Sequence, residues 1–279
     1  MSMYKSLLIS LPMILALGCG GHKDHHDHSD HDDHDDHDDH DDDDDDDDGS
    51  DDDTGEADPS VGEVRLAHFG VFPDDAGTEV DVFVNGEASG ITFGFKETTG
   101  FVELPAGSHT FDIVPAGGAI DDSVFTVEDF DLQSGTQWSI YAAGYVASDA
   151  GSAFTVNAIQ EDRVSIPEGQ VRVEVVHAAA LSALEPIDVW VVTDACEPDS
   201  PLVTDFEFDT SGTFDLPSTG INVGFDVGQD ATVDACFKIP DVGITDDIVT
   251  VYAVNTDGGD VSLIAHLPDG TNAEISPEM

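Results

Sequence analysis

The sequence predicts an all-β protein in which two tandem antiparallel β-sandwich domains follow a signal peptide and a disordered tether rich in His and Asp. Three observations support this. From Val61 onward, short runs of Val, Ile, Phe and Thr alternate with Gly, Pro, Asn and Asp, as strands and turns do. No stretch of ten or more residues after Val61 keeps a helical period. Similar motifs return about 110 residues apart, which predicts two copies of one domain.

Residues 1–18 are predicted to be a lipoprotein signal peptide. Lys5 precedes the mostly apolar run Leu7 to Leu17, and the small residue Gly18 precedes Cys19. The segment Ala16 to Cys19 resembles the lipobox of bacterial lipoproteins, although the usual Leu three places before the Cys is displaced by one. The resemblance implies that Cys19 carries diacylglycerol and anchors an exported protein in the cell envelope, at the outer membrane or the cell surface. An ordinary secretory cleavage before Cys19 fits the same residues.

Residues 19–60 form a low-complexity linker. Between His22 and Asp53 there is no aliphatic residue and no Phe, Tyr or Trp, so we expect this stretch to be a disordered, acidic spacer. Closely spaced imidazoles and carboxylates also suit weak binding of divalent ions such as Zn²⁺, Cu²⁺ or Ni²⁺, with no other cofactor expected. The candidate metal ligands are His22, His25, His26, His28, His31, His34, His37 and His40.

The first sandwich is expected over residues 61–160. Val80 to Val84 alternates before Asn85-Gly86, a dipeptide that accepts the positive φ angles of a type I′ hairpin turn. The expected strands are Glu63 to His68, Val80 to Val84, Ile91 to Phe95, Gly100 to Leu104, His109 to Val114, Ser123 to Val127, Trp138 to Val146 and Phe154 to Ile159.

The second sandwich is expected over residues 171–279, after a polar linker at residues 161–170. Four segments of the first copy return in the second. They are Val64 to His68 with Val173 to His177, Val80 to Val84 with Ile187 to Val191, Leu104-Pro105 with Leu216-Pro217, and Tyr141-Ala142 with Tyr252-Ala253.

These segments resemble a known family, the domain of unknown function 4397, which occurs singly and in tandem in secreted bacterial and archaeal proteins. The first copy supplies His68, the loop Phe72 to Ala76, Val80 to Val84 with Gly86, and Leu104 to Gly107. The second copy departs more, with three alanines after His177. The resemblance implies an immunoglobulin-like or related sandwich, and it implies no activity.

Charge excludes several classes of partner. The chain has 61 acidic and 7 basic residues, and residues 60–279 alone carry 39 acidic residues against five basic ones. A polyanion of this kind has little with which to bind nucleic acid, and an anionic lipid surface repels it. We expect most of these acidic side chains to face outward.

The residues that repeat in both copies include His68 and His177, together with Asp81 and Asp188. A His and an Asp on adjacent strands could act as a general base or bind a cation. A histidine that fixes a loop through a hydrogen bond explains the same repeat. No nucleophile elbow, Cys–His pair or phosphate-binding glycine loop appears in the repeats, so we expect no enzyme and no catalytic residue.

Cys196 and Cys236 are the cysteines that remain once Cys19 is acylated. Both lie in the second domain of an exported protein, so we expect a disulfide between them. Two buried free thiols are the alternative.

The sequence therefore predicts a non-enzymatic cell-envelope lipoprotein that displays two sandwich modules on an acidic spacer, as a structural or ligand-binding surface protein. Its expected partners are the membrane, through the lipid, and a protein or glycan of unknown identity. The alternative is a lipoprotein that sequesters transition metals with its His/Asp tract.

Overall fold

The computed structural model describes residues 60–72, 79–146, 151–241, 243–255 and 259–278, which all belong to one compact unit, Asp53–Met279. These residues are almost wholly β-structure, apart from two 3₁₀ turns, η2 (Ile120–Asp122) and η3 (Ser182–Leu184). The all-β class is therefore confirmed. In this part of the chain, no helix is long and apolar enough to cross a membrane.

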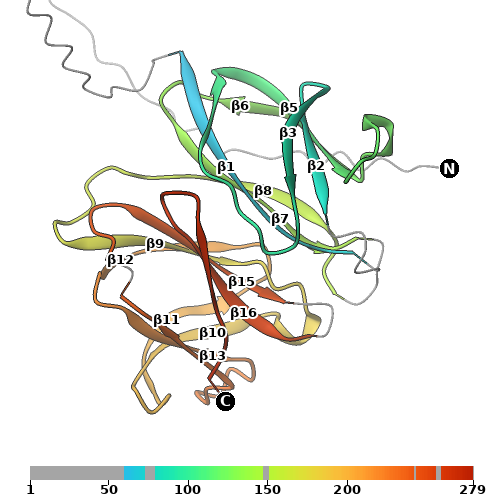
Figure 1. Cartoon of the computed structure of the whole chain (residues 1–279). Coiled ribbons are helices and arrows are strands. Elements are labelled where there is room, and N and C mark those ends of the chain that lie inside the picture. The colour runs from blue at the N-terminus through green and yellow to red at the C-terminus, as the bar shows by residue number, and fades with distance from the viewer. Residues whose placement is uncertain (1–59, 73–78, 147–150, 242, 256–258, 279) are drawn as a thin grey trace, which may run out of the picture. The chain divides into compact units, whose positions relative to one another are not determined.

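The strands from β1 to β8 form two four-stranded sheets that pack on each other (Figure 1). One sheet has the order β4-β1-β7-β8, and the other has the order β3-β2-β5-β6. In chain order, the strands are β1 (Val61–Val71), β2 (Val80–Val84), β3 (Glu87–Phe93), β4 (Val102–Pro105), β5 (Gly107–Pro115), β6 (Phe125–Leu132), β7 (Gln137–Tyr145) and β8 (Thr155–Gln160). We call this pair of sheets the first sandwich.

The strands from β9 to β17 repeat the arrangement as a second sandwich, with sheet orders β12-β9-β15-β16-β17 and β11-β10-β13-β14. Each strand from β9 to β16 thus takes the place of the strand eight positions earlier, and β17 is an addition at one edge. The strands are β9 (Gln170–His177), β10 (Ile187–Val192), β11 (Pro198–Phe206), β12 (Ser211–Pro217), β13 (Ile221–Asp226), β14 (Ala235–Ile239), β15 (Ile248–Asn255), β16 (Val261–His266) and β17 (Asn272–Ile275).

The β2–β3 connection is the two-residue hairpin that the sequence predicts. Asn85 and Gly86 have φ angles of 53° and 84°, so both central residues adopt the left-handed conformation of a type I′ turn. Asn85 also fixes the turn through its side chain, because its Oδ1 accepts a hydrogen bond from the Thr110 amide at 2.9 Å.

Each sandwich departs from the antiparallel pattern at one place. β1 pairs in parallel with β7, and β9 pairs in parallel with β15. Parallel strands are usually covered on both faces, and every residue of β15 is buried. Both faces are covered because the sheets that contain β1 and β9 also pack on each other. There Phe69 and Tyr252 have ring centroids 4.7 Å apart, and Tyr141 and Tyr252 have theirs 5.5 Å apart.

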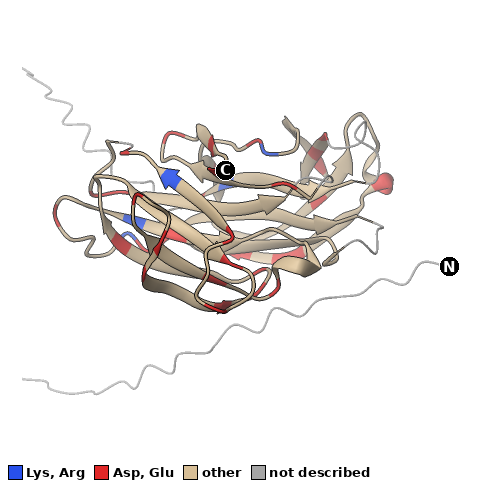
Figure 2. Cartoon of the chain, turned by 90° about the horizontal axis from the view of Figure 1, so that it is seen from below, with Lys and Arg blue, Asp and Glu red and all other residues tan. Residues whose placement is uncertain are grey.

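Acidic residues are spread over strands and turns in both sandwiches, whereas basic residues are few (Figure 2). The expectation that the acids face outward does not hold for all of them. Glu161, Glu174, Asp112 and Asp226 are buried. Two of these, Glu161 and Glu174, lie in the interface between the sandwiches, because a strand face that would meet solvent in an isolated sandwich is covered here by a second one.

Candidate functional site

The predicted lipidation and metal residues lie outside the described part of the chain. These are Cys19 and the histidines His22, His25, His26, His28, His31, His34, His37 and His40. Among the described residues, no group of three or more His, Cys, Asp or Glu side chains is placed to hold a metal ion.

Cys196 and Cys236 are brought together. Their sulfurs are bonded at 2.04 Å, which joins the turn after β10 to β14. Cys236 pairs with Gly224 of β13, so the bridge spans the sheet that covers the outer side of the second sandwich.

The repeated histidines and aspartates have separate partners. His177 is buried and its Nε2 donates a hydrogen bond to the Leu184 carbonyl at 2.7 Å; burial lowers its pKa, which keeps the ring neutral. Asp188 accepts hydrogen bonds from the Asp205 amide and the Gln229 side chain. His68 packs edge-on against Phe93 with ring centroids 5.6 Å apart. These contacts are those of residues that position loops and fill a core.

A buried arginine joins the two sandwiches. The Arg65 side chain, on β1, is fully buried, and its guanidinium lies 2.6 Å from a carboxylate oxygen of Glu161. It also donates to Ser139 Oγ at 2.8 Å in the first sandwich. Across the interface it donates to Thr250 Oγ1 at 2.9 Å and to the Leu267 carbonyl at 3.1 Å. A buried charge needs such complete pairing, because removal from water is costly.

Glu161 is held from a second side. Arg163 lies 3.2 Å from its other carboxylate oxygen and 2.6 Å from Asp247 of the second sandwich. The expected linker at residues 161–170 thus begins with a residue that takes part in the buried ion pairs, and its segment up to Arg163 bridges the two sandwiches.

Glu174, on β9, is the acidic group most affected by this environment. Burial, and after it the charge of Glu161, raises its pKa to about 7, while the charge of Arg65 opposes this. Its carboxylate accepts a hydrogen bond from Thr250 Oγ1 at 3.4 Å. Glu174 therefore changes its protonation state near neutral pH inside the interface.

Two further sets of side-chain contacts cross the interface near Tyr141 and Tyr252. Lys96 donates to Ser262 Oγ at 2.9 Å and lies 2.5 Å from Glu274, both in the second sandwich. From the other side, Asp209 accepts hydrogen bonds from Tyr141, at 2.9 Å, and from Asn157 of the first sandwich. These contacts and the Arg65 network hold the sandwiches as one body.

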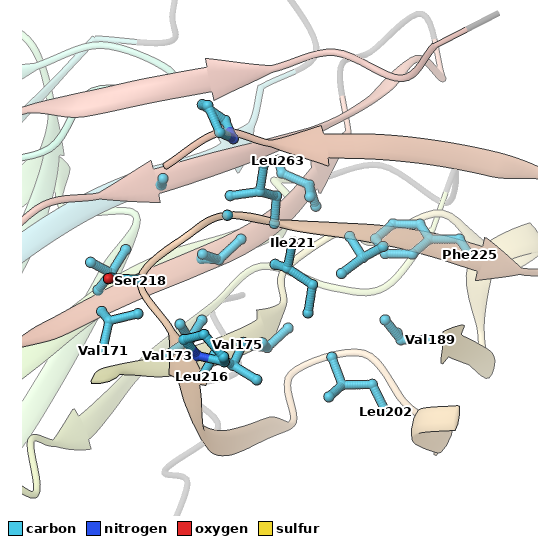
Figure 3. Close-up of a pocket in the computed structure, with 18 residues that line it drawn as sticks. Val171, Val173, Val175, Val189, Leu202, Leu216, Ser218, Ile221, Phe225 and Leu263 are labelled. Carbon is cyan, nitrogen blue, oxygen red and sulfur yellow. The ribbon is translucent and has the colours of Figure 1, made fainter. Parts of the chain in front are cut away.

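The interior of the second sandwich contains an apolar cavity of about 60 Å³ (Figure 3). Side chains from both of its sheets converge on it, among them Val173 of β9, Phe225 of β13 and Leu263 of β16. Ser218 lies at one end, in the turn between β12 and β13. The corresponding space in the first sandwich is about 20 Å³.

The comparison with known proteins assigns part of this architecture. Residues 62–190 match the family described as a domain of unknown function, DUF4397. The match covers slightly less than half of the chain, from β1 into β10. No curated protein matches the sequence. The DUF4397 match thus includes the first sandwich from Gly62 onward and the strand β9, which supplies Glu174 to the interface.

Sequence reasoning missed both the buried network and the cavity. One signal was present for the network: Arg65 lies in the mostly apolar strand β1, on the same face as Ala67 and Phe69. The signal for the cavity is that Phe111, Phe130 and Trp138 of the first sandwich correspond to aliphatic residues of the second. This correspondence is visible only when equivalent strands are aligned through their pairing.

Proposed function

We propose that the chain is an exported, lipid-anchored, non-enzymatic protein of the cell envelope that displays two DUF4397-type sandwiches as a single rigid body. The observation that carries this proposal is the fully buried Arg65, which binds groups of both sandwiches at once. A pair of domains joined in this way presents its loops and edges in a fixed arrangement. The buried charges pair with each other, which favours a structural over a catalytic role for them.

The second sandwich is a divergent second copy of the same domain in this proposal. Support comes from the shared strand order and from the parallel strand pair that each sandwich contains. Arg65 is the register partner of Ser139 in the ladder of β1 and β7, and Glu174 is the register partner of Thr250 in the ladder of β9 and β15.

The anchor in this proposal is the diacylglycerol on Cys19, supported by the apolar leader that ends at Gly18. The test is the intact mass of the mature amino-terminal peptide after expression in a bacterial host. We expect it to start at Cys19 and to carry acyl chains, and the Cys19→Ala variant should leave the membrane fraction. An unmodified Cys19, or a start elsewhere, contradicts the anchor.

The alternative, metal sequestration, rests on the eight histidines of the tether. Deletion of residues 22–48 from the full chain separates the two functions. A display protein keeps its binding of a surface protein or glycan, found in a screen with the intact chain, when this segment is lost. A metal store loses its Zn²⁺ capacity, measured as metal bound per chain at equilibrium.

A further inference from the structure

We infer that the cavity of the second sandwich is a binding site for the linear alkyl chain of an uncharged molecule. This goes beyond the display role and does not depend on the lipid anchor. Figure 3 shows the site, which lies between the sheet of β9, β15 and β16 and the sheet of β10, β13 and β14.

Three aromatic residues of the first sandwich have aliphatic counterparts along the cavity, while the same ladders give Ile113 and Val127 the larger counterparts Phe225 and Phe237. Phe111, Phe130 and Trp138 stack edge to face in the first sandwich, with successive ring centroids 5.6 Å and 5.3 Å apart. The pairing of equivalent strands gives their counterparts, which are Val223, Ile239 and Val249. All three counterparts line the cavity. The space that remains is about 60 Å³ in the second sandwich and about 20 Å³ in the first.

The volume is large enough for a ligand. A cavity needs roughly 10–15 Å³ to admit a single water, and dry apolar cavities take up apolar molecules instead. The cavity here measures about 60 Å³. Apolar side chains form its described lining, together with Ser218 and Gly220 of the β12–β13 turn, and no charged residue lines it. A water molecule would find few hydrogen-bond partners in this cavity, whereas a hydrocarbon has no hydrogen bonds to lose on entering it.

The way in lies at the β12–β13 turn. Pro217 and Pro240, which line this end, are exposed, while Phe225 and Leu263, which line the interior, are buried. An opening at this turn takes an alkyl chain end-on and leaves its polar head outside. The described surface around it belongs to a strongly acidic domain, which disfavours an anionic head group.

The test uses the full chain with Cys19→Ala, exported so that the disulfide forms and purified without detergent. Methyl NMR spectra are recorded during titration with 1-hexanol, 1-propanol and hexanoate at pH 8. We expect saturable shifts of the methyl groups of Val173, Val223 and Leu263, and an affinity that rises about fourfold per methylene from propanol to hexanol. Hexanoate should bind at least tenfold more weakly than hexanol, by the cost of placing a carboxylate beside an apolar opening.

Two variants locate the site. Val223→Phe restores the ring that Phe111 supplies in the first sandwich, and it should abolish the saturable shifts. Val164→Phe adds the same ring at a side chain that is 74% exposed, and it should leave them unchanged. If Val223→Phe does not fold, Ile239→Phe fills the same cavity from β14. No saturable shift in the parent, or shifts that survive the filling variant, would overturn the inference.

Discussion

Arg65 and Glu174 occupy equivalent positions on the first strands of the two sandwiches and bring a basic and an acidic side chain into one buried interface. Arg65 pairs with Ser139 in the ladder of β1 and β7, and Glu174 pairs with Thr250 in the ladder of β9 and β15. Lys96 and Asp209 show the same inversion, because each donates its amide to the carbonyl of the repeated histidine, His68 or His177. Two identical copies docked in this way would bring like charges together, so the interface is specific for the unlike pair.

Replacement of Arg65 tests this network. Arg65→Met removes the buried cation and leaves Glu161 with Arg163 as its remaining ionic partner and with the hydrogen bond from Ser139. We expect a loss of about 3 kcal/mol in the free energy of unfolding, measured by chemical denaturation. Lys238→Met breaks the exposed ion pair with Glu278 and serves as the control, with little change expected. Equal effects of the two substitutions would contradict the role assigned to Arg65.

Glu174 makes stability depend on pH. Its pKa is raised from 4.5 to about 7 in the folded protein, so the native state holds a proton that the unfolded state has already released. Stability from this group is full below pH 4.5 and is lost as the pH rises towards and past 7. The loss is on the order of 3 kcal/mol.

Glu174→Gln should reduce the loss of unfolding free energy with rising pH, because the amide stays neutral and its oxygen can still accept a hydrogen bond from Thr250. Denaturant unfolding between pH 4.5 and pH 8.5 measures the effect. Glu103→Gln, at an exposed position on β4, is the matched control and should keep the slope of the parent. A variant at Glu174 that follows the parent at every pH would refute the assignment.

Removal of the disulfide should weaken the second sandwich. The bridge closes a loop between positions 40 residues apart, and in the chain-entropy model such a loop restricts the unfolded state by about 4 kcal/mol. The double variant Cys196→Ser and Cys236→Ser should lose stability of this order and should no longer respond to a reductant. Thiol counting on the unfolded, unreduced parent provides the check, since two reactive thiols from these positions would rule the bridge out.

Gly70 is required where β1 passes under an aromatic ring. A Cβ at this position would lie 2.3 Å from Phe154 Cε2 and 3.1 Å from His68 Cε1, and Phe154 is itself packed against Phe72 and Phe125. We expect Gly70→Ala to cost about 1–3 kcal/mol in thermal or denaturant unfolding. Gly94→Ala is the control, because its Cβ would meet nothing closer than 3.6 Å. If both alanines are tolerated equally, the packing argument at Gly70 fails.

Local chemistry was enough to predict most of the strands and the β2–β3 hairpin. Val80 to Val84 alternates with period two and is followed by Asn85-Gly86, and both facts depend on neighbouring residues alone. The spacing of Val64 to His68 and Val173 to His177 revealed two similar halves, because the same strand in the same fold needs the same pattern of side chains.

The sequence by itself determined which residues form strands and which of the two faces each side chain takes, since alternation along a strand fixes that. Only the tertiary structure decided what covers each face. Arg65 and Glu174 point away from their own cores, and they are buried because another sheet packs there. The cavity likewise depends on side chains from both sheets of the second sandwich, such as Val223 and Val249, which are distant in the sequence and meet when the sheets pack.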